Sequence, residues 1–282
     1  MYKAENEINN LEILRNRART GYAIYAAGLL IAVIMAFLSN IVWAAVIGGI
    51  TVLLYFLIFR RDIKNFRKKY RICNLVLEAE KFIKIEEVAA KGLFSAQKVW
   101  EDGVLPGHPE KGTIQIGLKG STSKISRAEL ADIAFPIPIL RTDGKMQNKI
   151  LSGCYMRLQL KADTRHQMAC FHAGRWTTEA LIQHYETAGF TVCREGEVYF
   201  AERAEDSQPD MNLREKLQQL DLILGGREVI YINQSQIFAM LAEYFLNIGE
   251  PDFKHPVTKE KFNHRYLAGV QSMITFANNL NN

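Results

Sequence analysis

The sequence has no charged residue between Gly21 and Phe59, a run of 39 positions in a chain of 282 residues. A helix of that length would extend about 58 Å at about 1.5 Å per residue, whereas the hydrocarbon core of a bilayer is about 30 Å thick. One straight membrane span is therefore excluded. Division at Ser39-Asn40, a pair that suits a tight turn, gives two apolar segments, residues 21–38 and 41–59, each about as long as one span.

Charge is instead concentrated beside this run. Residues 1–20 carry a net charge of +1, residues 60–71 carry +6, and the rest of the chain carries −2. Because positive flanks stay on the cytoplasmic side, we expect a bacterial inner-membrane protein with a transmembrane hairpin and both termini in the cytoplasm. A buried hairpin in a soluble protein is the alternative, but such helices normally keep a polar stripe.

The basic cluster after the second segment predicts contact with the membrane surface. Anionic lipid headgroups attract such side chains by about 1 kcal/mol for each charge, so the expected partners include the lipid bilayer and its anionic lipids. A nucleic-acid partner is not expected, because the remainder of the chain has no basic excess. The cluster consists of Arg60, Arg61, Lys64, Arg67, Lys68, Lys69 and Arg71.

Cysteine is sparse, and its four positions show no short paired spacing, which favours reduced thiols over a disulfide framework. We expect no cleavable signal peptide, because the apolar run is far too long for one. No Asp, Glu, Lys, Arg or His lies within either apolar segment, so the hairpin indicates an anchor and not an ion path.

Small residues recur at helical spacing in both apolar segments. Gly28, Ala32 and Ala36 lie four apart in the first, and Ala44 and Gly48 lie four apart in the second. Small side chains let helix backbones approach closely in lipid. They predict helix packing, either within the hairpin or between two chains.

Beyond the hairpin the sequence predicts the α+β class. Residues 1–20 form an amphipathic cytoplasmic segment that lies in the interface or packs on the helix after the second span. Residues 60–92 form a basic juxtamembrane helix, with residues 62–90 helical, and residues 93–282 form a mixed α+β cytoplasmic domain. Expected strands cover residues 113–118, 124–126 and onward, 149–160, 166–172, 190–193, 197–201 and 228–232, and expected helices cover 177–188, 211–224, 235–246 and 258–279.

Catalytic motifs are lacking. The stretch from Gly117 to Lys124 lacks the Gly-Lys-Ser/Thr order of a phosphate loop and is better explained as a turn between strands. Cys170 and His172 share one face of an expected strand, with His166, Cys154 and Cys193 nearby in sequence, and they are the candidate metal ligands. Buried cysteine and a structural histidine explain the same residues, so no cofactor or metal is assigned.

Three short stretches resemble a family of bacterial membrane proteins of unknown function. They are Gly92-Leu-Phe-Ser95, Trp100-Glu-Asp-Gly103 and Ile125-Ser-Arg-Ala-Glu-Leu130, followed by Gly153-Cys-Tyr155 at a strand. The resemblance covers roughly residues 62–245 and implies a membrane segment, a basic helix and a cytoplasmic α+β domain. Arg127-Ala128 interrupts the family's Ser-Glu-Leu segment. The family has no established activity, so the resemblance supports architecture alone.

Three functions are consistent with these patterns. The first is a membrane-anchored scaffold whose cytoplasmic domain binds a protein partner or a second copy of itself. The second is a membrane-tethered enzyme or metal-site protein that uses Cys170 and His172. The third is a sensor of anionic lipid that acts through residues 60–71. The missing catalytic set favours the first.

Overall fold

The computed structural model describes residues 4–38, 40–89, 92–107, 112–140, 143–164, 166–175, 177–203, 211–246, 257 and 267–280. The chain divides into two compact units. One comprises Met1–Leu77 with Ile248–Asn263, and the other comprises Glu78–Asn247 with His264–Asn282. The first is helical and the second contains a large antiparallel sheet, which confirms the α+β class.

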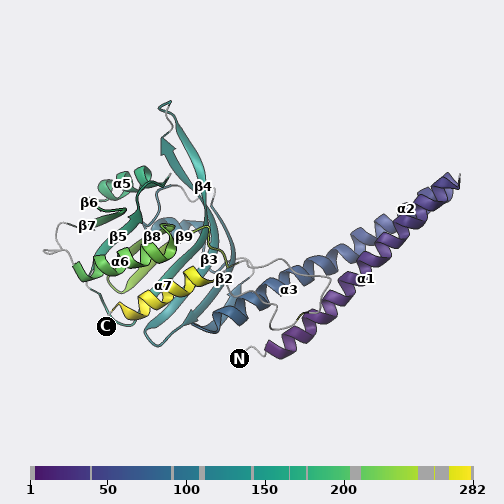
Figure 1. The fold of residues 1–282 in the computed structure, drawn as a ribbon, viewed down its shortest axis with the longest axis horizontal. Helices are drawn as coiled ribbons and strands as arrows, with labels where there is room; N and C mark the ends of the chain where they lie inside the picture. Colours follow the sequence, from purple (N-terminus) through teal and green to yellow (C-terminus); the bar gives the residue numbers. More distant parts are fainter. Residues whose placement is uncertain are drawn as a thin grey trace. The chain divides into compact units, whose positions relative to one another are not determined.

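The first unit contains two long helical segments (Figure 1). Its elements are α1 (Ala4–Phe37), α2 (Ile41–Leu54), the π-helical turn η1 (Tyr55–Phe59) and α3 (Arg60–Ala79). The helix breaks where the sequence predicted a corner, although Ser39 itself lies outside the described residues. Asn40 occupies the N-cap position of α2 with φ of −103° and makes no side-chain capping bond. The corner therefore does not use Asn40 as a left-handed residue or as a cap.

The two helical segments pack antiparallel through small residues. Gly28 lies against Thr51, and Gly48 lies against Ala32. A Cβ atom on Gly28 would lie 2.4 Å from Thr51 Oγ1, so no larger residue fits there without moving the helices. Of the other small residues singled out in the sequence, Ala44 is half-buried and Ala36 is exposed.

The first turns of α1 pack on α3, which is one of the two arrangements expected for the N-terminal segment. Leu11 lies in a buried cluster with Phe66, Tyr70, Cys73 and Val257. The Val257 N–H also donates to Glu12 Oε2 over 2.9 Å. Val257 is thus held to the helical unit although it follows the sheet in sequence.

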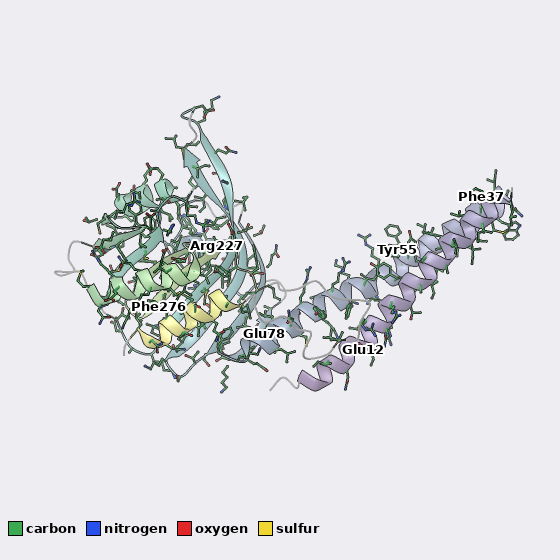
Figure 2. All side chains as sticks on the ribbon, in the orientation of Figure 1. Glu12, Phe37, Tyr55, Glu78, Arg227 and Phe276 are labelled. Atoms are coloured by element: carbon green, nitrogen blue, oxygen red, sulfur yellow. The ribbon has the colours of Figure 1, made fainter. Side chains whose placement is uncertain are left out.

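Two helices, Ile8–Phe37 and Ile41–Ala79, are long and apolar enough to cross a membrane by length and composition. Figure 2 shows side chains directed outward along both, with Phe37 at the end where the chain turns. α1 thus merges the predicted amphipathic segment with the first apolar segment, and α2 continues through η1 into α3.

The second unit is built on a nine-stranded sheet, antiparallel at every described pairing. Its order is β1-β2-β3-β4-β9-β8-β5-β7-β6. The strands are β1 (Lys84–Ala89), β2 (Thr113–Ser121), β3 (Ile125–Leu140), β4 (Met146–Leu160), β5 (Gln167–His172), β6 (Phe190–Glu195), β7 (Val198–Arg203), β8 (Glu228–Asn233) and β9 (Gln236–Ala242).

Helices cover both faces of the sheet. They are α4 (Ala96–Glu101), α5 (Thr178–Thr187), α6 (Met211–Leu224) and α7 (Ala268–Asn279). On β5, Phe171 stacks on Tyr185 of α5, while the next residue, His172, bonds Asp221 of α6. Because consecutive strand residues point to opposite faces, α5 and α6 lie on opposite sides. Figure 1 shows α7 beside α6 on the same face.

Two local predictions were wrong and one short helix was missed. The predicted helix over 62–90 ends at Ala79, and Lys84–Ala89 is instead a strand, because pairing with β2 outweighs helix propensity there. Residues 235–246 were predicted as helix but contain β9, whose residues from Ile237 to Leu241 are all buried. A continuous apolar run does not separate a central strand from a helix. The short helix α4 was also missed. Residues 258–266 of the last predicted helix lie outside the described residues.

The contact between Gly28 and Thr51 yields a matched pair of substitutions. Gly28→Val should loosen the hairpin, because its side chain would collide with Thr51, whereas a Cβ on Gly49 meets nothing within 4 Å. We expect Gly28→Val to lower the apparent melting temperature of the full chain in detergent micelles, in line with an overpacking cost of about 1–3 kcal/mol. Gly49→Val, the control, should melt like wild type, and equal melting of the two variants would refute this contact.

Candidate active site

A pocket of about 200 Å³ lies at one end of four central strands, β4, β5, β8 and β9. Its position follows from the register, which aligns Phe171 of β5 with Val229 of β8, and Glu228 of β8 with Leu241 of β9. Apolar walls come from side chains on the α5 face of the sheet, including Phe171, Val229 and Met240. The ionisable residues that line it are His172, Arg175, Arg227, Glu228 and Glu243.

His172 and Asp221 form the central polar pair of this pocket. His172 Nδ1 lies 3.1 Å from both carboxylate oxygens of Asp221. The Asp221 side chain is only 4% exposed, whereas that of His172 is 26% exposed and reaches the pocket. A carboxylate on Nδ1 favours the tautomer that carries its proton there. His172 Nε2 then has its lone pair available.

The end of α6 positions this pair. The Gly226 N–H donates to the Asp221 carbonyl over 3.1 Å, and both Gly225 and Gly226 have left-handed φ angles, of 66° and 65°. This is the arrangement that closes helices at paired glycines. Gly226 also lies against the imidazole of His172, where a Cβ would come within 2.5 Å of the ring. The Gly-Gly pair therefore ends the helix and leaves room for the histidine.

Glu228 is a buried acid next to the pair. It is 3% exposed, and it lies close enough to Asp221 for the two acids to interact. Burial first, and then the carboxylate of Asp221, raise the pKa of Glu228 to about 10. Glu228 is therefore neutral at physiological pH, while Asp221 can remain the hydrogen-bond acceptor for His172.

Two arginines border the same pocket. Arg175 donates from Nε to the Gly226 carbonyl over 2.8 Å, which fixes its side chain beside the end of α6. Its Nη1 lies 3.8 Å from Glu243 Oε1, and Arg227 Nη1 lies 3.2 Å from Glu243 Oε2. One carboxylate is thus shared by two guanidinium groups at the pocket.

A histidine with a carboxylate on Nδ1 can act as a general base through Nε2. Cys170, on the same face of β5, does not supply an exposed nucleophile, because it is 1% exposed and burial raises the pKa of its thiol well above the usual range. The arrangement can therefore bind an anion and accept a proton, while Cys170 is part of the buried interior.

The structure separates the candidate metal ligands. Among the described residues, no three His, Cys, Asp or Glu side chains are placed to hold a metal ion. Cys170 and His172 share a face of β5, as expected, but His172 forms its hydrogen bond with Asp221. Cys154 is buried on β4, and Cys193 is half-buried on β6. The stretch from Gly117 to Lys124 forms the end of β2 and the turn before β3.

The basic cluster lies along α3. Six of its seven side chains are exposed and Arg71 is half-buried, so the positive charge is available at the surface of the helical unit. It begins directly after the apolar turn η1, as its place in the sequence implied.

Comparison of the chain with protein-family models, with curated proteins and with solved structures finds no match.

Sequence reasoning found His172 and missed the residues around it. Asp221 is 49 positions away from His172, and Arg175, Arg227 and Glu243 belong to three separate turns of the chain. No short spacing links them, because the antiparallel register alone brings them together. A signal that could have been used is the charged Arg227-Glu228 pair at the start of an otherwise apolar strand.

Glu228 should make stability depend on pH. Its pKa is about 10 in the fold and close to the usual 4.5 in the unfolded chain, so its contribution is fully present below about pH 4.5 and is lost as pH rises toward 10. We expect Glu228→Gln to stabilise the full chain relative to wild type at pH 8, by at most about 5 kcal/mol, and progressively less toward pH 5. Denaturant unfolding at several pH values measures this difference in stability.

Glu197→Gln, at an exposed carboxylate, is the control and should leave the wild-type pH profile unchanged. Parallel profiles for Glu228→Gln and wild type would contradict the assignment.

Proposed function

We propose that this chain is a bacterial inner-membrane protein, anchored by the α1–α2 hairpin, whose sheet domain serves as a cytoplasmic scaffold that pairs with a second copy of itself. The observation that carries the scaffold proposal is an open, self-complementary edge on β4. The anchor and the edge are supported separately, and each has its own test.

The anchor is supported by apolar side chains that the fold leaves uncovered. Phe37 is 85% exposed, Ile41 is 74% exposed and Leu57 is 66% exposed. A soluble hairpin would need a covering partner over its whole length, whereas hydrocarbon covers all sides at once. Residues 21–37 and 41–59 would span roughly 26 and 28 Å as helices, close to the thickness of a bilayer core of about 30 Å.

The orientation follows from the positive flanks. The exposed basic cluster on α3 continues the same helical segment that contains the second apolar stretch. On the cytoplasmic side, anionic headgroups would attract these side chains by about 1 kcal/mol for each charge. Both termini and the sheet domain would then lie in the cytoplasm.

This topology predicts the activity of reporters fused to the full chain. A periplasm-dependent reporter inserted after Asn40 should be active, and a cytosol-dependent reporter at the same place should be inactive. The same two reporters at the C-terminus should behave in the opposite way. Cytosolic activity at Asn40, or recovery of the full chain from the soluble fraction without detergent, would overturn the anchor.

The scaffold function is supported by the two-stranded ribbon that β3 and β4 form beyond their neighbours. β9 pairs with β4 only from Gly153 to Gln159. Among the described residues, no strand pairs with the second edge of Met146–Leu151. An open strand edge is a template for pairing with another chain. Apolar side chains are exposed on the ribbon, including Leu140, Met146 and Ile150.

The sequence of this edge matches itself in reverse. If two copies pair antiparallel about Asn148, Met146 of one lies opposite Ile150 of the other, and Gln147 lies opposite Lys149. Apolar residues then face each other, and no two like charges are directly opposite. A two-fold interface needs such self-complementarity. The resemblance to a family of bacterial membrane proteins is compatible with this proposal but names no partner.

Pairing about Asn148 predicts a disulfide between identical positions. Two cysteines directly opposite on antiparallel strands have Cα atoms about 4.5–5.5 Å apart, within the range for a disulfide. Asn148→Cys in the full chain should therefore give a covalent dimer when membranes are oxidised. Glu197→Cys, at the exposed tip of the β6–β7 hairpin, is the matched control and should remain monomeric. Equal dimer yields from both variants, or none from Asn148→Cys, would refute the edge pairing.

A further inference from the structure

The pocket beside His172 has the charge and shape of a binding site for a small organic anion, a property that the scaffold proposal does not use. Its charged groups are two arginines and one exposed carboxylate, that of Glu243. Glu228 is neutral because it is buried beside Asp221. Two guanidinium groups against one carboxylate leave the groups that border the open space with an excess of positive charge.

Glu243 occupies the place that a ligand carboxylate would take. Arg227 and Arg175 approach its two oxygens separately, at 3.2 and 3.8 Å. Its side chain is nevertheless 59% exposed, so solvent weakens this ion pair and an incoming anion can compete for the guanidinium groups. Paired guanidinium groups are the usual means by which proteins hold a carboxylate.

The backbone at Glu243 is also unusual. Its φ angle is 65°, in the left-handed region that residues with a Cβ rarely adopt. The Glu243 N–H donates to the Ser152 carbonyl over 2.9 Å, and that bond holds the turn in place. Strained backbone that the surroundings hold in this way is typical of ligand clamps. The turn brings a carboxylate to the two arginines at the residue directly after Ala242, the last residue of β9.

The remaining residues of the pocket favour a ligand that has an apolar part beside its carboxylate. Phe171, Leu181, Val229 and Met240 line it, and its volume is about 200 Å³. A cavity of about 150 Å³ holds a benzene molecule, so this pocket accepts a ring or branched chain with one further small group. Larger cofactors and nucleotides do not fit, since their sites are usually about 300–1,000 Å³.

We propose that this pocket binds a small aryl or branched-alkyl monocarboxylate of about ten non-hydrogen atoms. Its carboxylate would displace that of Glu243 from Arg227 and Arg175, and its apolar part would lie against Phe171 and Met240. Glu243 is then an internal competitor that keeps the guanidinium groups paired when the pocket is empty.

Benzoate is the test ligand, with equilibrium dialysis of labelled benzoate against the full chain in detergent micelles. Protein-free micelles correct for partition into detergent. We expect saturable binding by wild type, and competition by unlabelled benzoate but not by benzyl alcohol, which lacks the charge, or by inorganic phosphate, which lacks the apolar body. Stronger competition by phenyl phosphate than by benzoate would overturn the carboxylate class.

Substitutions then separate the pocket from general attraction to positive charge. Arg227→Ala should weaken benzoate binding by at least about tenfold, because a charge-assisted contact is lost. Glu243→Gln should strengthen it by about two- to fivefold, because an exposed ion pair of this kind no longer competes. Arg194 and Glu197 form a similar exposed pair elsewhere, 3.7 Å apart, so Arg194→Ala and Glu197→Gln should leave binding unchanged.

Three results would refute the proposal. The first is an absence of saturable benzoate binding by both wild type and Glu243→Gln. The second is an equal loss of binding in Arg227→Ala and Arg194→Ala. The third is weaker binding by Glu243→Gln than by wild type. The first and the competition series do not depend on the arginine variants, so misfolding of Arg227→Ala would not leave the question open. Self-pairing through β4 is tested separately, and its failure would not affect this site.

Discussion

The pairing of β9 between β4 and β8 is the constraint on which the sheet domain depends. One half of the sheet is the run of β1 to β4, and the other half contains β5 to β8. Among the strands that the structure describes, β9 alone bonds to both halves, because it follows β8 through a tight turn and returns along β4. Its insertion brings the ends of four central strands together. The pocket, with walls from both halves, exists because of that single strand.

Much of the fold could be predicted where local patterns decide it. The apolar length and the Ser-Asn pair located the break between α1 and α2, and helical periodicity with paired glycines located α6 at its observed bounds, Met211–Leu224. β9 could not be predicted in the same way, because residues buried on both faces lose the alternation that marks a strand. β1 was missed since its glutamates suit a helix, and only pairing with β2 decides otherwise.

The candidate site illustrates the same limit. The sequence showed His172 as a histidine on an expected strand. Its role as a general base depends on Asp221 and Glu228, which follow it by about fifty positions. Two acids placed together take different roles because one is hydrogen-bonded to the imidazole and the other is buried without a cation. The arginines of the pocket lie in turns, where composition alone suggests a solvated surface. The charges of Arg175 and Arg227 indicated a site only once the strand register showed that both arginines lie beside the carboxylate of Glu243.

The return of the chain to the helical unit at Val257 has a consequence for dissecting this protein. Leu11 and Glu12, near the N-terminus, hold a residue that follows the whole sheet. The helical unit is therefore discontinuous in sequence, and no single cut separates an intact anchor from an intact domain. A fragment that begins after the second apolar segment would lack Leu11 and Glu12, so Val257 would keep only the part of its cluster that α3 supplies. Any property measured on such a fragment would include that loss.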